Sequence, residues 1–140
     1  MKKSYHILPW FILLGFVFSS FIHSPGPQKL IIGKWELKEI VSADSIPNPI
    51  EAAINKYFVG ITYEYKKDSI VKAELSKKQS LTGTFESSPC RYYLVKEKKK
   101  YFLIHLWKGN EERYKISILD AETLCYTGNG ETYILKRLKQ

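Results

Sequence analysis

Between residues 61 and 138 the chain is a series of short runs in which apolar and polar residues alternate, separated by turn-forming residues. Alternation with a period of two predicts β-strands that have one buried and one wet face. Strands that recur at short, regular intervals predict a meander, a barrel or a sandwich. No run is long and continuously apolar, and no crossover helix separates the runs, so a parallel α/β sheet is excluded.

The runs predict about eight or nine antiparallel strands. They are expected at 30–41, 61–65, 71–75, 81–85, 90–95, 101–107, 113–119, 123–127 and 131–138. Gly128-Asn129-Gly130 is a strong hairpin signal, because these residues accept a positive φ. An open meander leaves two exposed edges, and closure removes them. We therefore expect an all-β, antiparallel up-and-down β-barrel in which the first and last strands are neighbours.

One short helix is expected after the first strand. It follows a loop at 42–49 that contains two prolines, and its apolar residues recur at helical spacing; they are Ile50, Ala53, Ile54, Tyr57 and Phe58. This is the only segment of the body that fits a helix.

The first 24 residues have the features of an export signal. Lys2 and Lys3 precede an apolar run at 7–22, which is shorter than the ~20 residues of a spanning helix. We expect a signal peptide at 1–24, a linker at 25–29 and a single domain at 30–140. The protein would then reside in the periplasm, the cell envelope or outside the cell, and an uncleaved membrane anchor is the alternative.

The charge of the chain is strongly positive, with a formal net charge of +8. The lysines gather at predicted turns, such as 66–67, 77–78 and 96–100, where they protect strand edges and keep turns solvated. They are not interleaved with exposed aromatic residues on one face. We therefore expect no nucleic-acid partner, whereas the oligomeric state is left open.

Two motifs at the ends of the body carry a resemblance to a known family. Gly33-Lys34-Trp35 opens the first strand, and Arg137 ends the last one. This pattern resembles the signature of lipocalins, and the length and export signal resemble bacterial lipocalin-like domains. The resemblance implies that Trp35 closes one end of the barrel and that Arg137 packs across it and bonds the N-terminal backbone. Gly33 would let the chain pass beneath the ring. These three residues are expected to be structural.

Tyrosines give the expected interior a mixed character. Tyr63, Tyr65 and Tyr92 share the parity of aliphatic neighbours and should point inward. Their rings and hydroxyls suit a small apolar or amphipathic ligand, with Ile54 and Phe58 of the helix covering the open end. These five are the candidate ligand-binding residues.

The competing interpretation is a barrel that the tyrosine rings simply fill. The protein would then be a structural or interaction protein with an envelope partner. The run 101–107 favours this view, since it is apolar on both faces and one face must be covered by the helix or by a partner.

No catalytic, metal-binding or cofactor motif was found, so we expect no enzyme activity, no metal and no cofactor. His105 is the only histidine of the body and is expected to be a packed or surface residue. Cys90 and Cys125 are a possible disulfide in an oxidising compartment, and the sequence leaves their pairing open.

Overall fold

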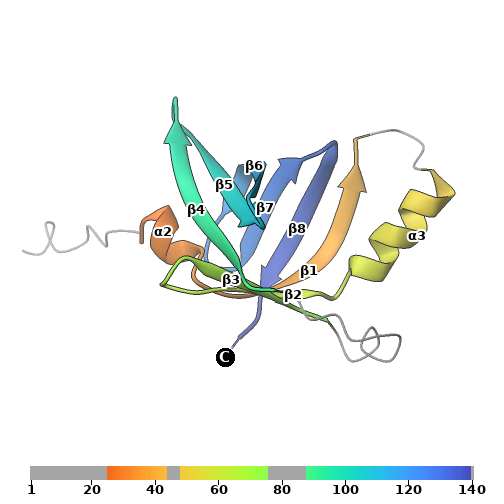
Figure 1. Ribbon diagram of the computed structural model, residues 1–140, viewed down its shortest axis with the longest axis horizontal. Coiled ribbons are helices and arrows are strands. Elements are labelled where there is room, and N and C mark those ends of the chain that lie inside the picture. The colour runs from red at the N-terminus through yellow and green to blue at the C-terminus, as the bar shows by residue number, and fades with distance from the viewer. Residues whose placement is uncertain (1–24, 44–47, 76–87, 140) are drawn as a thin grey trace, which may run out of the picture.

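Eight antiparallel strands close into a barrel in the computed structural model, which describes residues 25–43, 48–75 and 88–139. The strands follow one another around the barrel in chain order, so the first pairs with both the second and the last (Figure 1). They are β1 (Gly33–Ser42), β2 (Thr62–Tyr65), β3 (Ile70–Glu74), β4 (Cys90–Glu97), β5 (Lys100–Trp107), β6 (Asn110–Leu119), β7 (Thr123–Gly128) and β8 (Glu131–Arg137). The predicted fold class is confirmed.

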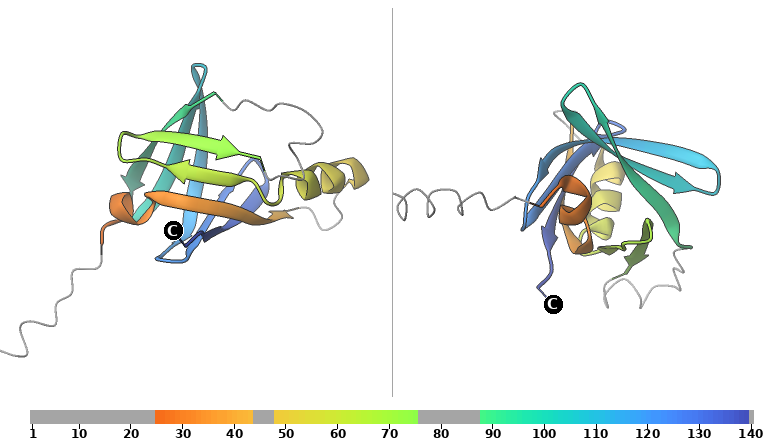
Figure 2. Two further views of the ribbon diagram at one scale, coloured as in Figure 1. Left: turned by 90° about the horizontal axis from the view of Figure 1, so that it is seen from below. Right: turned by 90° about the vertical axis from the view of Figure 1, so that its left-hand side faces the viewer.

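The two helices of the described residues, α2 (Pro27–Leu30) and α3 (Pro49–Phe58), lie at opposite ends of the barrel (Figure 2). The helix expected after the first strand is confirmed as α3. The side-chain oxygen of Asn48 accepts a hydrogen bond from the Ile50 amide at 3.0 Å, and Pro49 occupies the first turn. Both features favour a helix start at this point. Neither described helix is long and apolar enough to cross a membrane.

The short helix α2 stands where the sequence predicted a linker and the start of the first strand. Gly26 is extended and Pro27 begins the helix with its fixed φ, while Ile31 behind it is fully buried. The positive φ of Gly33, +136°, then redirects the chain into β1. The strand therefore begins at 33 and not at 30, and part of the expected linker is helical.

Two of the expected segments lie outside the described residues, namely the leader at 1–24 and the strand at 81–85. In the described residues β3 pairs directly with β4, with Val71 opposite Cys90. The tight hairpin between β7 and β8 has Asn129 and Gly130 at positive φ, as the sequence predicted.

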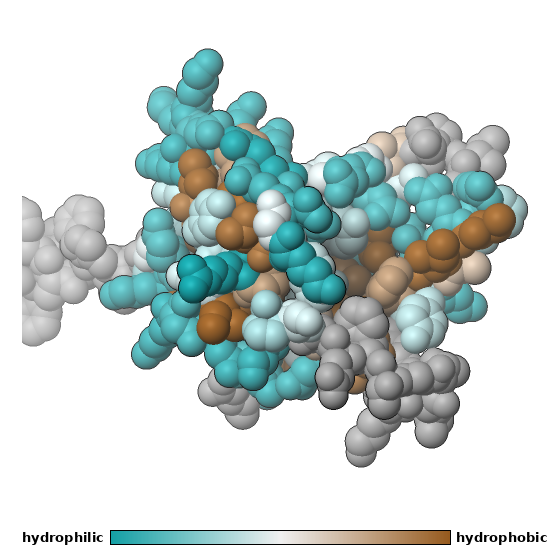
Figure 3. All heavy atoms as spheres, viewed as in Figure 1, coloured by the Kyte–Doolittle hydropathy of each residue, from teal (hydrophilic) through white to brown (hydrophobic). Residues whose placement is uncertain are grey.

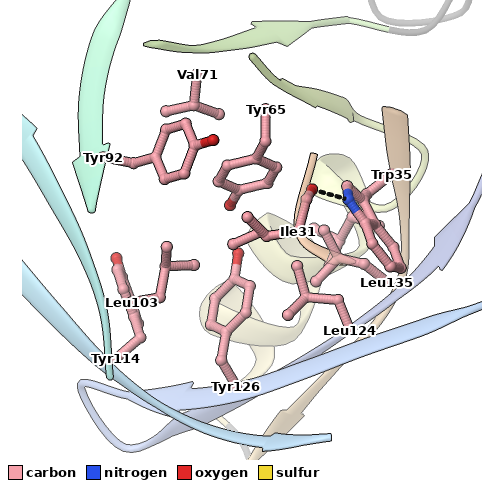
Figure 4. Packing of buried hydrophobic residues seen from close by; sticks show 11 residues of the cluster. Ile31, Trp35, Tyr65, Val71, Tyr92, Leu103, Tyr114, Leu124, Tyr126 and Leu135 are labelled. Atoms are coloured by element: carbon pink, nitrogen blue, oxygen red, sulfur yellow. Dashed lines mark hydrogen bonds between the residues drawn. The ribbon is translucent and has the colours of Figure 1, made fainter. Parts of the chain in front are cut away.

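The end of the barrel next to α2 is closed by a compact apolar core (Figure 4). Its buried members include Ile31, Trp35, Leu37, Leu103, Leu124 and Leu135. Tyr65, Val71 and Tyr92 also point into this core, as their parity predicted. Burial of this many large apolar side chains is the main source of stability for a domain of this size.

The apolar strand β5 was expected to need the helix or a partner over one of its faces. Leu103 points into the core, and Ile104 on the opposite face is also buried. On that outer face the guanidinium of Arg113, from β6, lies 4.1 Å from the centre of the Phe102 ring. A side chain of the neighbouring strand therefore covers Phe102, by a cation–π contact.

Trp35 and Arg137 meet where β1 pairs with β8 and closes the barrel. The Arg137 guanidinium lies 4.1 Å from the centre of the Trp35 ring, and its nitrogens donate to the carbonyl oxygens of Leu30, Ile32 and Ala121. The Trp35 indole donates to the Ile31 carbonyl at 2.7 Å. The closure implied by the resemblance to lipocalins is therefore present.

Candidate ligand-binding cavity

A cavity of about 580 Å³ occupies the end of the barrel next to α3, opposite the closed end. Its walls come from all eight strands and from α3. Figure 3 shows the hollow beside α3, with hydrophobic residues of that helix along its rim. The lining includes Leu37, Ile40, Ile54, Asn55, Phe58, Tyr63, His105, Trp107, Glu112, Tyr114, Tyr126, Glu131 and Tyr133.

The side chains that line this cavity come from the whole circumference of the barrel, because each of the eight strands places at least one of them in the lining. From α3, Ile54 and Phe58 turn their apolar side chains toward the opening, while Ile50 is 69% exposed and lies outside the lining. The opening is therefore bordered by one face of an amphipathic helix.

Aromatic rings form one continuous wall of the cavity. The ring centres of His105 and Tyr114 are 5.4 Å apart, and those of Tyr114 and Tyr126 are 5.1 Å apart. Tyr133 completes the wall, with its ring centre 5.9 Å from that of Tyr114 and 5.2 Å from that of Tyr126. Contacts at these separations stabilise aromatic clusters. The wall runs over four consecutive strands, from β5 to β8.

Two of the five predicted ligand residues belong to the floor beneath the cavity. The rings of Tyr65 and Tyr92 meet edge to face with centres 4.9 Å apart. The Tyr65 hydroxyl lies 3.1 Å from Nε2 of His105, and the Tyr92 hydroxyl donates to the Lys66 carbonyl at 2.7 Å. Figure 4 shows the Tyr65 hydroxyl facing that of Tyr126. Neither ring lines the cavity, whereas Tyr63, Ile54 and Phe58 do.

Two glutamates on the cavity wall are held by tyrosine hydroxyls. Tyr114 donates to Oε2 of Glu112 at 2.8 Å, and Tyr133 donates to Oε2 of Glu131 at 2.6 Å. The side-chain amide of Asn55 donates to the other oxygen of Glu131 at 2.9 Å, which ties α3 to β8. Burial, the hydrogen bond to the carboxylate and its charge all raise the pKa of Tyr114, so this hydroxyl keeps its proton.

His105 is buried between the floor and the cavity. Burial lowers its pKa to about 4, and the Glu112 carboxylate opposite it on β6 offsets part of that lowering. The imidazole is therefore neutral near pH 7. The expectation of a packed histidine fits this position, and the ring also contributes to the cavity lining.

Sequence reasoning missed the acidic and aromatic residues on β6 to β8. Glu112, Tyr114 and Ile116 alternate along β6, and Glu131 has the same parity as Tyr133 on β8. This alternation was a usable signal, because residues two apart on a strand share a face. The glutamates were overlooked because a charged residue normally marks the wet face of a strand.

The possible disulfide between Cys90 and Cys125 is absent, and both thiols are free. The two cysteines stand on β4 and β7, and β5 and β6 lie between these strands in the sheet. Such a separation is too large for a bond that needs Cα atoms within ~7 Å. The Cys90 thiol donates to the Leu106 carbonyl at 3.2 Å. In the described residues, no three His, Cys, Asp or Glu side chains are grouped closely enough to hold a metal ion.

Comparison with known proteins supports the fold and nothing finer. No family model and no curated protein matches the chain. A solved structure of a lipocalin-like protein from Bacteroides uniformis is similar at a TM-score of 0.50, with 16% identity over 78% of this chain and 99% of that chain. An uncharacterized protein from Bacteroides eggerthii has a TM-score of 0.47 at 16% identity, covering 76% and 98% of the two chains. The chain has a lipocalin-like fold.

Proposed function

We propose that this protein is an exported carrier that binds a small amphipathic ligand in its barrel. The observation that carries the proposal is the cavity of about 580 Å³, which lies within the usual size range of small-molecule sites. It is closed at one end by the Trp35 core and bordered at the other by α3. Apolar and aromatic side chains dominate its lining, and a few polar groups are available to orient a ligand.

The alternative of a filled barrel fits only the end of the barrel next to α2. There the rings of Tyr65 and Tyr92 contact each other and leave the cavity lining to other residues. The end next to α3 contains the cavity, and Tyr63 is part of the cavity lining. A concave, mostly apolar site of this size that opens beside α3 is the usual setting for a small-molecule ligand.

Export is the second part of the proposal and is supported by the sequence of the leader. Lys2 and Lys3 followed by the apolar run 7–22 are the pattern of a secretory signal. N-terminal sequencing of the protein purified from its source should find a first residue between about 21 and 28, as expected for the length of such a signal. Recovery of intact Met1 from a membrane fraction would contradict this part.

Ligand binding is tested with a panel of fatty acids, sterols, aliphatic alcohols, amines and aromatic metabolites. A compound that binds the folded state raises the melting temperature by mass action, and it should also change the tyrosine and tryptophan fluorescence. Tyr63→Trp adds bulk inside the cavity and should reduce the shift strongly while the fold is kept.

Tyr93→Trp is the matched control for that variant. Tyr93 is 40% exposed and does not line the cavity, so the same substitution should leave the thermal shift unchanged. Absence of a shift with every compound of the panel would reject the carrier and favour the interaction protein with an envelope partner. Equal loss of binding in both variants would place the ligand outside the cavity.

A further inference from the structure

The charge of the cavity is opposite to that of the whole protein. Three glutamates line it, Glu51, Glu112 and Glu131, whereas none of the lining residues that the structure describes is a lysine or an arginine. The chain as a whole has a formal net charge of +8. His105 is the one described lining residue that could become positively charged by binding a proton, and it is neutral near pH 7.

Glu112 and Glu131 also lack a cationic partner within the described residues. The salt bridges there join other pairs, such as Arg113 with Glu97 on the outer face. Tyr114 and Asn55 donate neutral hydrogen bonds that hold the two carboxylates in place without cancelling their charge. Glu112 is exposed and Glu131 is half-buried, and carboxylates fixed at the wall of an open cavity favour a positively charged occupant.

Tyr63 lies near the Glu112 carboxylate in the same cavity. Burial raises the pKa of its hydroxyl to about 12, and the Glu112 carboxylate adds to this effect. The residue lines the cavity. Because this hydroxyl keeps its proton, it can accept a hydrogen bond from a cation that the neighbouring carboxylate attracts.

The aromatic wall opposite this hydroxyl fits the same chemistry. Tyr114, Tyr126 and Tyr133 stand in mutual contact on three adjacent strands. The faces of such rings attract organic cations, most strongly where water is excluded. Carboxylates, ring faces and apolar side chains therefore surround the same space.

We propose that the ligand is an amphipathic amine, whose protonated nitrogen lies between Glu112 and Tyr63 and whose apolar part lies against the aromatic wall and Phe58. This inference rests on the proposed carrier function and specifies the chemical class of its ligand. A fatty acid would bring a carboxylate up to Glu112 and Glu131, so the site disfavours it.

Three probes with the same chain length separate these possibilities, namely decylamine, decan-1-ol and decanoate. Each is titrated calorimetrically into the full mature protein at pH 7, below the concentration at which the probe aggregates. An alkylamine is protonated at this pH, as a lysine side chain is. We expect the amine to bind about tenfold more tightly than the alcohol, and decanoate to bind most weakly.

This order is diagnostic because the surface of the protein would produce the opposite one. The formal net charge is +8 for the whole chain and +6 without Lys2 and Lys3 of the leader, so non-specific attraction favours decanoate over decylamine. A preference for the amine must therefore arise from the local charge of the cavity.

Glu112→Gln removes the charge and nearly preserves the shape of the side chain. It should lower the affinity for decylamine by about tenfold and leave that for decan-1-ol unchanged. Glu111→Gln is the matched control, because Glu111 is the preceding residue on β6, is exposed and does not line the cavity. Glu131→Gln provides the same test on β8 in case the first variant loses its fold.

The outcomes distinguish this inference from the function on which it rests. Equal affinity for all three probes, or a preference for decanoate, would overturn the amine and leave the carrier standing. No binding of any probe, together with no shift in the wider panel, would overturn the carrier itself. An amine preference that survives both Glu112→Gln and Glu131→Gln would also overturn the inference.

Discussion

Gly33 shows how one residue without a side chain makes the closure of the barrel possible. Its φ is +136°, and a Cβ built at this position would clash with Nη1 of Arg137. Gly33→Ala should therefore lower the free energy of unfolding by about 2 kcal/mol or more, measured by urea denaturation. Gly109→Ala is the control, because Gly109 also has a positive φ, +83°, but has open space around it. Equal losses in the two variants would show that backbone conformation alone matters at Gly33.

His105 makes the stability of the protein depend on pH. The pKa of the imidazole is about 4 in the folded state, against an ordinary value of 6.5 that the unfolded chain approaches. The unfolded state therefore binds more protons between these values. The contribution of the neutral His105 is complete above about pH 6.5 and is lost as the pH falls toward 4, by on the order of 3 kcal/mol.

Urea denaturation at pH 7.5 and pH 4.5 measures this loss. His105→Gln keeps a polar side chain that does not titrate, so the variant should lose less stability than the wild type between the two pH values. Other groups titrate equally in both proteins, and the difference between them isolates His105. An identical pH dependence would mean that the histidine is accessible to protons in the folded state.

At the scale of the element, α3 is attached to the barrel by few contacts. Its apolar side chains Ile50 and Tyr57 are largely exposed, and Asn55 provides the hydrogen bond to Glu131 on β8. Asn55→Ala should accelerate amide hydrogen exchange in 49–58 by about fivefold, because the helix loses a charge-assisted bond. Exchange in the strands should be unchanged.

Lys56→Ala is the control for the helix, since Lys56 is the next residue and is exposed. It should leave the exchange rates of α3 close to those of the wild type. If Asn55→Ala also had no effect, the position of α3 over the cavity would depend on its apolar contacts alone.

At the scale of the whole molecule, the contact between Trp35 and Arg137 joins the two ends of the domain. β1 and β8 are paired at this point, and Arg137 also binds the backbone on either side of Ile31. Trp35→Leu and Arg137→Met should each destabilise the protein more than a surface change does. The double variant should cost less than the two losses together, with a coupling of ~0.5–3 kcal/mol in denaturant unfolding. Strict additivity would show that the contact contributes nothing to closure.

The strands β1 to β8, the helix α3 and the pair Trp35 and Arg137 could be predicted from the sequence, whereas the helix α2 was not. Each is a local property: a period of two along a strand, a spacing of three and four in 50–58, or a glycine beside a tryptophan. Closure followed from the need to remove two sheet edges. Features that depend on residues close together in the chain can therefore be predicted from the sequence.

The depth of a residue along the barrel was decided only by the tertiary structure. Tyr63 and Tyr65 have the same parity and were equal candidates, yet the first lines the cavity and the second bonds His105 in the floor. Depth depends on strand register and stagger around a closed sheet, which arise from all the strands together. For the same reason, the meeting of Glu112, Glu131 and the tyrosines in one cavity is a property of the closed barrel, and no single run of residues specifies it.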